Sequence, residues 1–248
     1  MRPAIAAHPE DASAVAAELK ARVGQVARGA ARAAVLGVSD GLVTNLCLIL
    51  GLTGANATAS AVELAALASL LAGAFSMAAG EWISVRSQVE LFESLIGGLR
   101  RLIERNPRAI LDELTASLEQ AGFGRATAQV ATTELPLDEP RFLRFCSMNL
   151  FGIDPDSLGS PLAAATSSFG LFAVGAFVPL APWLFAGGAE AVVLSICLAG
   201  AASLVVGGYV ARSTTRSVSF GAARQLAIVA AASAVTYGIG HLFGAVVG

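Results

Sequence analysis

Five long apolar stretches do most to limit what this chain can fold into. They cover residues 33–52, 64–85, 163–185, 189–210 and 226–247. Each has about the 20 residues that an α-helix needs to cross a hydrocarbon core ~30 Å thick. A bilayer core offers no partner to an open backbone N–H or C=O, so such stretches cross it as helices. The sequence therefore predicts an all-α membrane protein with five transmembrane helices, in contact with the lipid bilayer.

The scarcity of charge excludes most other classes of protein. Only 14% of the 248 residues are charged and 55% are hydrophobic, whereas an ordinary soluble domain is about 25% charged. Five apolar helices in a soluble enzyme would need a polar shell that this chain lacks. The formal net charge of −2, without a basic tract, excludes a nucleic-acid binder. Three scattered cysteines, Cys47, Cys146 and Cys197, do not form a secreted disulfide framework.

The region between the second and third apolar stretches has a different character. It is rich in charge and predicts a small lobe of short amphipathic helices. We expect these helices at 88–105, from Pro107 to a stop at Gly122, at 125–133 and at 139–150. The predicted division of the chain is an N-terminal segment over 1–32, two spans over 33–85, a cytoplasmic lobe over 86–160, and three spans over 161–248.

The N-terminal segment carries charged side chains and no apolar run before a cleavage site, so we do not expect a signal peptide. Apolar residues recur at helical spacing in it, at Val15, Leu19, Val23 and Val26. This pattern predicts a helix over 11–30. Such a helix either lies along the membrane surface or is a solvated leader, and the sequence does not choose between these.

The basic residues predict the orientation. All 16 lie before the first span, between the second and third, or between the fourth and fifth. They are Arg2, Lys20, Arg22, Arg28 and Arg32; Arg86, Arg100, Arg101, Arg105, Arg108, Arg125, Arg141 and Arg144; and Arg212, Arg216 and Arg224. By the positive-inside rule, the N-terminus and the lobe are cytoplasmic and the C-terminus is outside. Without a cleavable signal, we expect a plasma (inner) membrane, with an organelle as the alternative.

Two carboxylates stand inside the spans, where an acidic side chain costs roughly 2.5–3.5 kcal/mol at mid-membrane. Asp40 is in the first span and Glu81 in the second, and both belong to the cytoplasmic part. Thr44 follows Asp40 by four residues, with Cys47 a turn further on, and Met77 precedes Glu81 by four. Carboxylates, a hydroxyl and a thioether suit a transient divalent-metal site, and the sulfur favours iron-like or manganese-like ions.

Each of these residues also has a simpler interpretation. Glu81 lies near the end of a span and could extend to the headgroups. Met77 could fill a gap in the core. Asp40 could cap a helix that begins deeper in the membrane.

Glycine pairs predict close helix contacts and a second subunit. Gly37 and Gly41 are four apart in the first span, as are Gly240 and Gly244 in the fifth. Five spans show no obvious inverted repeat. If the transport pathway needs more helices around it than one chain supplies, they would come from a second copy, so we expect a homodimer.

His241 is expected to be an interfacial residue. No common catalytic motif occurs, so an enzyme is not expected.

Three segments resemble the vacuolar iron transporter family. They are Ala-Val-Leu-Gly-Val-Ser-Asp-Gly-Leu-Val-Thr at 34–44, Gly-Ala-Phe-Ser-Met-Ala-Ala-Gly-Glu-Trp-Ile-Ser-Val at 73–85, and Ser-Ser-Phe-Gly-Leu-Phe-Ala-Val-Gly-Ala-Phe-Val-Pro-Leu-Ala-Pro at 167–182. The resemblance implies a dimer of five-span protomers without a cofactor, exporting Fe²⁺ or Mn²⁺ from the cytoplasm in exchange for protons. It implies that Asp40 and Met77 line a pore between the protomers, and that Glu81 lies near its cytoplasmic entrance.

The lobe departs from the family pattern, which implies a cluster of glutamates that gathers metal. Residues 96–104 read Ile-Gly-Gly-Leu-Arg-Arg-Leu-Ile-Glu, and Asn149-Leu150-Phe151 replace a pair of glutamates. Glu113 is the best-preserved lobe carboxylate, with Glu104 and Asp112 as weaker candidates. We therefore expect a retained pore and a lobe that is structural or a weak metal collector. The alternative is a transporter of another ion or solute, or a non-transporting membrane partner.

Overall fold

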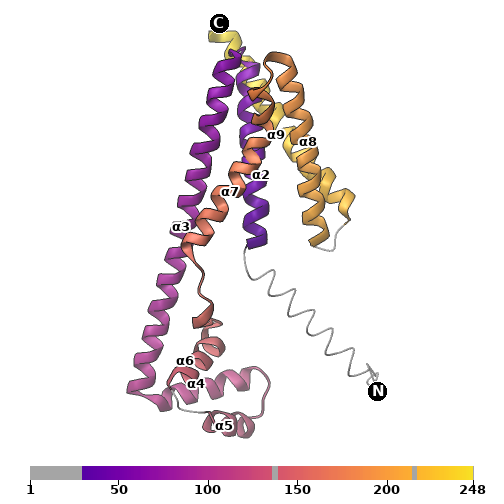
Figure 1. Cartoon of the computed structure of the whole chain (residues 1–248). Coiled ribbons are helices and arrows are strands. Elements are labelled where there is room, and N and C mark those ends of the chain that lie inside the picture. Colours follow the sequence, from indigo (N-terminus) through magenta and orange to yellow (C-terminus); the bar gives the residue numbers. More distant parts are fainter. Residues whose placement is uncertain (1–29, 136–138, 214–216, 248) are drawn as a thin grey trace, which may run out of the picture. The chain divides into compact units, whose positions relative to one another are not determined.

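The computed structural model describes residues 30–135, 139–213 and 217–247, and this part of the chain contains helices and no strand (Figure 1). The helices are α2 (Ala30–Gly54), α3 (Ala59–Arg105), α4 (Pro107–Gln120), α5 (Arg125–Thr133), α6 (Glu139–Cys146), the π-helix η1 (Ser147–Phe151), the 3-10 helix η2 (Pro155–Ser157), α7 (Pro161–Leu180), the 3-10 helix η3 (Ala181–Leu184), α8 (Gly188–Ser213) and α9 (Val218–Val247). Apart from its last residue, the helix predicted over 11–30 lies outside the described residues.

Five of these segments are long and apolar enough to cross a membrane. They are Val35–Gly54, Ala59–Arg105, Pro161–Leu184, Gly188–Arg212 and Val218–Val246. The predicted all-α membrane fold with five spans is therefore confirmed. The chain divides into two compact units, one of residues up to Gly80 together with Ala163 onward, and one of Glu81–Leu162.

The second span does not stop where the sequence suggested. We predicted a span ending at residue 85 and a separate helix over 88–105, but α3 is one helix from Ala59 to Arg105. No glycine or proline interrupts residues 81–96, so nothing in this stretch breaks the backbone pattern. Arg86 also donates from Nε to Glu90 Oε1 at 2.7 Å. This i,i+4 ion pair stabilises the helix where the predicted span and the predicted lobe helix join.

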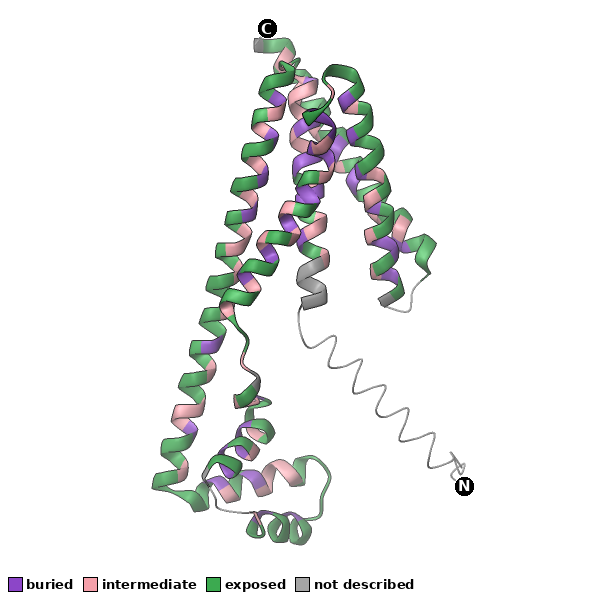
Figure 2. Cartoon of the chain, viewed as in Figure 1, coloured by how far each residue is buried: buried purple, intermediate pink, exposed green. Residues whose placement is uncertain are grey.

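The first unit has its core where α2, α3, α7, η3 and α8 meet. Buried apolar side chains from these helices form one cluster, composed of Ile49, Val62, Ala66, Leu70, Ala74, Phe172, Ala176, Leu180, Trp183 and Ala191. Most outward positions of the spans are green in Figure 2, because a single chain leaves them exposed. Since this protein lies in a bilayer, such apolar surface faces lipid or another chain rather than water.

Glycines let the spans of this unit touch through their backbones. A Cβ on Gly41 would overlap the carbonyl of Phe172 on α7, and one on Gly175 would overlap the carbonyl of Val38 on α2. A Cβ on Gly240 of α9 would likewise overlap the carbonyl of Gly51 on α2. Small residues permit this close approach in membranes, where packing takes over from the hydrophobic effect.

The third span changes its helix type at its prolines. The sequence predicts a kink or unwinding near Pro179 and Pro182, and the α-helix does give way to the 3-10 helix η3 at Ala181. Pro182 has no N–H, so it cannot close a 3-10 bond onto the carbonyl of Pro179. Ser195 Oγ on α8 donates to that carbonyl at 2.6 Å, and Trp183 Nε1 donates to Ser195 Oγ at 3.1 Å.

The second unit has a small apolar core of its own. It joins the last turns of α3 to α4 and α6 through Leu99, Ile110, Leu114, Phe142, Leu143 and Cys146, and Leu150 of η1 packs against it. Asn106 caps α4, since its Oδ1 accepts from Ala109 N at 3.3 Å, and Pro107 opens the helix. Gly122 follows α4 with φ +100°, which agrees with the predicted stop. The helix expected over 139–150 instead ends as the π-helix η1, closed by Gly152 at φ 68°.

Candidate functional site

Asp40 and Thr44 form a polar pair on the exposed side of α2. Thr44 Oγ1 donates to Asp40 Oδ1 at 3.4 Å, so the two side chains share a face, as their spacing predicts. Both are exposed in the single chain although they lie within the span Val35–Gly54. A carboxylate at such a position is costly in lipid, so this face requires water, an ion or another chain beside it.

The backbone around Asp40 rules out one simpler interpretation. Asp40 is the eleventh residue of α2, which begins at Ala30. A capping side chain binds the open N–H groups of the first turn, and Asp40 lies well past that turn. It is therefore not an N-cap, and its carboxylate remains available to another partner.

Met77 brings a thioether close to α2. It is half-buried and packs against the core of the first unit, so it does fill a gap there. Its Cε lies 3.6 Å from where a Cβ on Gly37 would be. Gly37 precedes Asp40 by three residues, which places the Met77 methyl group about one helical turn from Asp40 along α2.

Glu81 is half-buried and follows Met77 by four residues, one turn further along α3. Its placement at a site with Asp40 and its extension to the headgroups both stay predictions.

Cys47 lies on the same side of α2 as Asp40 but is covered there by α9. It continues the line from Asp40 and Thr44 as expected, and its Sγ lies 4.0 Å from Ser233 Oγ on α9. Seven residues after Asp40, an α-helix has turned by about 700°, which is 20° short of two full turns. The helix α9 covers that part of α2, so the thiol faces a neighbouring helix of the same chain.

These side chains supply only part of a metal shell. Within the described ranges, no three His, Cys, Asp or Glu residues come together as a group that could hold a metal ion. One carboxylate and one hydroxyl at Asp40 and Thr44 provide too few ligands for a hard divalent cation, which takes about six or more. If metal binds there, further ligands come from water or from a second copy.

The lobe carboxylates are not gathered into a cluster. Glu104 is near the end of α3, Asp112 and Glu113 are on α4, and all three are exposed. Several other acidic side chains of this unit are ion-paired. Arg144 contacts Asp154 at 3.0 Å and Asp156 at 2.8 Å, so those oxygens already have a cationic partner.

Cys146 is part of the lobe core rather than a metal ligand. Its side chain is fully buried among Leu114, Phe142 and Leu143. Burial raises the pKa of the Cys146 thiol to about 11, and a bond with its own backbone lowers it by less. The thiol therefore stays protonated at neutral pH, and only the thiolate is a good metal ligand. Met148, whose thioether is the other sulfur group of the lobe, is exposed on η1.

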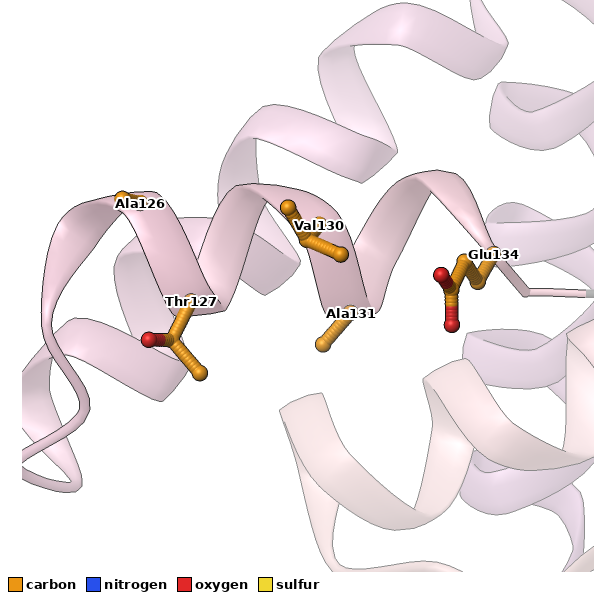
Figure 3. A pocket seen from close by; sticks show the side chains of 5 residues that line it. All are labelled: Ala126, Thr127, Val130, Ala131 and Glu134. Atoms are coloured by element: carbon orange, nitrogen blue, oxygen red, sulfur yellow. The ribbon is translucent and has the colours of Figure 1, made fainter.

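A shallow hollow on α5 lacks the chemistry of a metal site. Figure 3 shows its lining, which comes from α5 and the residue that ends it: Ala126, Thr127, Val130, Ala131 and Glu134. One carboxylate and one hydroxyl on a single helix do not surround an ion. The hollow therefore adds nothing to the candidate site.

The sequence analysis missed two amide side chains that join α2 to its neighbours. Asn45 is fully buried, and its Nδ2 donates to the carbonyl of Ala176 on α7 at 2.7 Å, while Oδ1 has no partner within the described structure. An unpaired buried acceptor costs about 1–3 kcal/mol. Gln225 on α9 donates from Nε2 to Ser39 Oγ at 3.4 Å. An isolated amide in an apolar stretch was the signal that could have identified Asn45, whereas Gln225 lies just before the fifth stretch.

The matches to known proteins agree with this fold. The model of the VIT family matches residues 31–241, which include the first four spans, the lobe and most of the fifth span. This chain belongs to the VIT family. The members of this family are transporters rather than enzymes, as expected from the absence of catalytic motifs.

Curated relatives resemble the chain over most of its length. Vacuolar iron transporter 2 of Oryza sativa subsp. japonica is 30% identical over 83% of this chain and 84% of its own length. Vacuolar iron transporter of Acanthamoeba castellanii is 31% identical over 85% and 77%. Vacuolar iron transporter homolog 1 of Oryza sativa subsp. japonica is 33% identical over 86% and 73%.

The predicted plasma (inner) membrane is wrong. The relatives are named as vacuolar transporters, which associates this type of chain with the membrane of an intracellular compartment. The expectation was based on an N-terminal segment without a cleavable signal, a feature that does not say which membrane receives the chain. The prediction of an integral membrane protein is confirmed.

Proposed function

We propose that this protein is a membrane transporter that moves Fe²⁺ or Mn²⁺ out of the cytoplasm into a vacuole-type compartment, in exchange for protons. The observation that carries the proposal is the exposed Asp40 carboxylate, hydrogen-bonded by Thr44, within a membrane span. An ionisable side chain within a membrane span is by default a candidate functional residue. The names of the relatives supply the metal.

The transported ion is the substrate of this site and needs no resident cofactor. Carboxylate and hydroxyl oxygens bind divalent cations, and the thioether of Met77 adds a soft contact near Gly37. That mixture favours Fe²⁺ or Mn²⁺ over Mg²⁺ or Ca²⁺. Glu81, one turn along α3, would lead the ion in from the cytoplasmic side.

The site is incomplete in one chain, which supports a homodimer. A two-fold axis beside the exposed face of α2 would bring a second carboxylate and a second hydroxyl to the same ion. It would also remove the Asp40 carboxylate from lipid. The pathway then lies between the protomers.

Proton exchange follows from the same carboxylates. A carboxylate that releases a metal ion can accept a proton in its place, and the proton must leave before the next ion binds. Transport into the compartment would then be driven by a proton gradient directed outward from it. The exposed lobe carboxylates Glu113, Glu104 and Asp112 would at most collect metal weakly.

The test is metal uptake by purified protein in proteoliposomes, with and without a pH gradient. Asp40→Asn keeps the shape of the side chain and removes its charge, so uptake of Mn²⁺ and Fe²⁺ should be abolished. Glu134→Gln, which changes an exposed carboxylate at the end of α5 in the same way, is the matched control and should transport normally. Undiminished uptake by a folded Asp40→Asn variant would rule out the assignment.

The sparse lobe keeps a second function open, transport of another ion or solute on the same fold. Flux measured in parallel for Fe²⁺, Mn²⁺, Co²⁺ and Zn²⁺ separates the two. Absence of flux for all four metals in the intact protein would favour this alternative.

A further inference from the structure

Two hydrogen bonds from neighbouring helices bracket the Asp40–Thr44 pair. Ser39, directly before Asp40, accepts from Gln225 Nε2 of α9 at 3.4 Å. Asn45, directly after Thr44, donates to the Ala176 carbonyl of α7 at 2.7 Å. The segment 39–45 of α2 is thus tied at both ends, to two different helices.

The angles around α2 give these two bonds a common effect. An α-helix turns about 100° per residue. If Ser39 is set at 0°, Asp40 lies at about 100°, Thr44 at about 140° and Asn45 at about 240°. The Asp40–Thr44 pair therefore lies between the two tied residues around the helix, and both of its side chains are exposed in the single chain.

The packing around Gln225 holds its side chain against α2. A Cβ on Gly207 of α8 would lie 2.7 Å from Gln225 Cβ, so α8 leaves no space on that side. Gly207 and Gly221 also bring the backbones of α8 and α9 into contact. Because these two helices pack so closely, the backbone of Gln225 is fixed in position, and its side chain extends from there to Ser39.

Asn45 is also held in place, and packing alone does not explain why a polar amide occupies this buried position. It is fully buried, and its Oδ1 has no partner within the described structure. A leucine has the same branched shape and as many side-chain heavy atoms, and it would bring no unpaired acceptor. What the amide adds, compared with an apolar side chain, is the hydrogen bond that its Nδ2 makes to α7.

We propose that Asn45 and Gln225 are positioning residues, which fix the rotation of α2 so that Asp40 and Thr44 face away from the core of the protomer. They do not touch the ion. Their effect on transport rests on the proposed function, whereas their effect on the direction of Asp40 and Thr44 does not.

A labelling experiment tests the direction without measuring transport. In the full chain carrying Cys47→Ala and Cys197→Ala, Thr44→Cys reports how readily a small hydrophilic thiol reagent reaches this face. We expect Asn45→Leu and Gln225→Met each to slow labelling about threefold to tenfold, the range expected for loss of one hydrogen bond. Thr236→Val on α9 is the control, because Thr236 Oγ1 donates only to Ala232 of its own helix, and it should leave the rate unchanged.

Transport kinetics give the second measurement. Both variants should raise the KM for Mn²⁺ about fivefold with little change in maximal rate, because about 1 kcal/mol corresponds to this factor. Ser39→Ala combined with Gln225→Met should be no worse than either change alone, since Gln225 acts through Ser39. A purely structural loss would instead lower the amount of folded transporter, and so the maximal rate, with the KM unchanged.

Labelling rates within twofold of the parent for both variants would overturn the positioning proposal, whatever the transport results. Normal uptake by Asp40→Asn would instead overturn the proposed function and leave the labelling result to decide this one.

Discussion

Two polar residues of the same helix have opposite environments. Asp40 is exposed in the single chain and bonded to Thr44, whereas Asn45 is fully buried and bonded to α7. The sequence could identify Asp40, because a charge in an apolar stretch stands out by composition. It could not show what Asn45 binds, because the Ala176 carbonyl is 131 residues away along the chain.

Cys146 carries a prediction about pH at the residue scale. Burial raises the pKa of its thiol to about 11, from 9.0. A raised pKa stabilises the fold fully below the unfolded value, and this contribution is lost as pH rises from 9 through 11. The free energy of unfolding, followed by chemical denaturation at several pH values, should fall in that window.

The matched variant for this test is Cys146→Ala. Its free energy of unfolding should fall less between pH 9 and 11, because the Cys146 thiol is absent.

Labelling gives a second measure of the burial of Cys146. At pH 8, iodoacetamide should modify Cys146 at least about tenfold more slowly in the folded protein than in sodium dodecyl sulfate, because the thiolate reacts and burial suppresses it. Equal rates would show that the thiol is accessible.

At the scale of helices, termini marked by local chemistry were predictable and tertiary contacts were not. Pro107 and Gly122 mark the ends of α4 in the sequence, and the helix predicted over 125–133 is α5 as observed. The continuity of α3 was missed because a drop in hydropathy was taken for a helix end. Helical spacing gives the side of α2 on which Cys47 lies, but it does not show that α9 covers that side there.

Gly240 and Gly238 differ by one contact and make a matched pair. A Cβ on Gly240 would overlap the Gly51 carbonyl, whereas a Cβ on Gly238 would meet nothing within 4 Å. Gly240→Ala should separate α9 from α2 and lower the unfolding temperature or abolish folding. Gly238→Ala should be neutral or stabilising, since alanine favours a helix by up to about 1 kcal/mol over glycine. Size-exclusion profiles and thermal unfolding in detergent measure both, and similar behaviour of the two variants would contradict the packing described for α2 and α9.

Ser195 carries a prediction about the junction of α7, η3 and α8. Ser195→Ala would leave the Pro179 carbonyl and Trp183 Nε1 without their partner, at a cost of about 1–3 kcal/mol for each buried group left unpaired. Thermal unfolding in detergent should show this loss.

Ser203 on the same helix is the control for that change. It is also buried, but it donates to the Gly200 carbonyl of its own helix at 2.7 Å. Ser203→Ala should therefore cost less than Ser195→Ala. Equal losses for the two variants would argue against a special role for the proline junction.

At the scale of the whole molecule, the five spans were the most predictable feature. Their lengths follow from bilayer thickness, and the scarcity of charge leaves few alternatives. The identity of the membrane was not predictable, because nothing in the apolar stretches distinguishes a vacuole from a plasma membrane. A closed metal site was not predictable either, since one chain brings Asp40 and Thr44 together but does not surround an ion.

The lobe gives a prediction about the whole transporter. Replacing its three candidate carboxylates together, as Glu104→Gln, Asp112→Asn and Glu113→Gln, should leave the KM for Mn²⁺ within about twofold of the parent. All three are exposed, and the described structure does not gather them into a metal-binding group, so none gains the affinity of a shared ion. Uptake into proteoliposomes measures this, and a KM about tenfold higher would show that the lobe does collect metal.

The hydroxyl of Ser195 has a consequence for how the chain enters the membrane during synthesis. Until α8 is present, the third span holds a proline junction whose Pro179 carbonyl lacks the partner it has in the finished fold. Loss of a hydrogen-bond partner by a polar group in lipid costs free energy, which disfavours release of that span from the insertion machinery by itself. The third and fourth spans should then leave it together, as a helical hairpin already joined by Trp183 and Ser195.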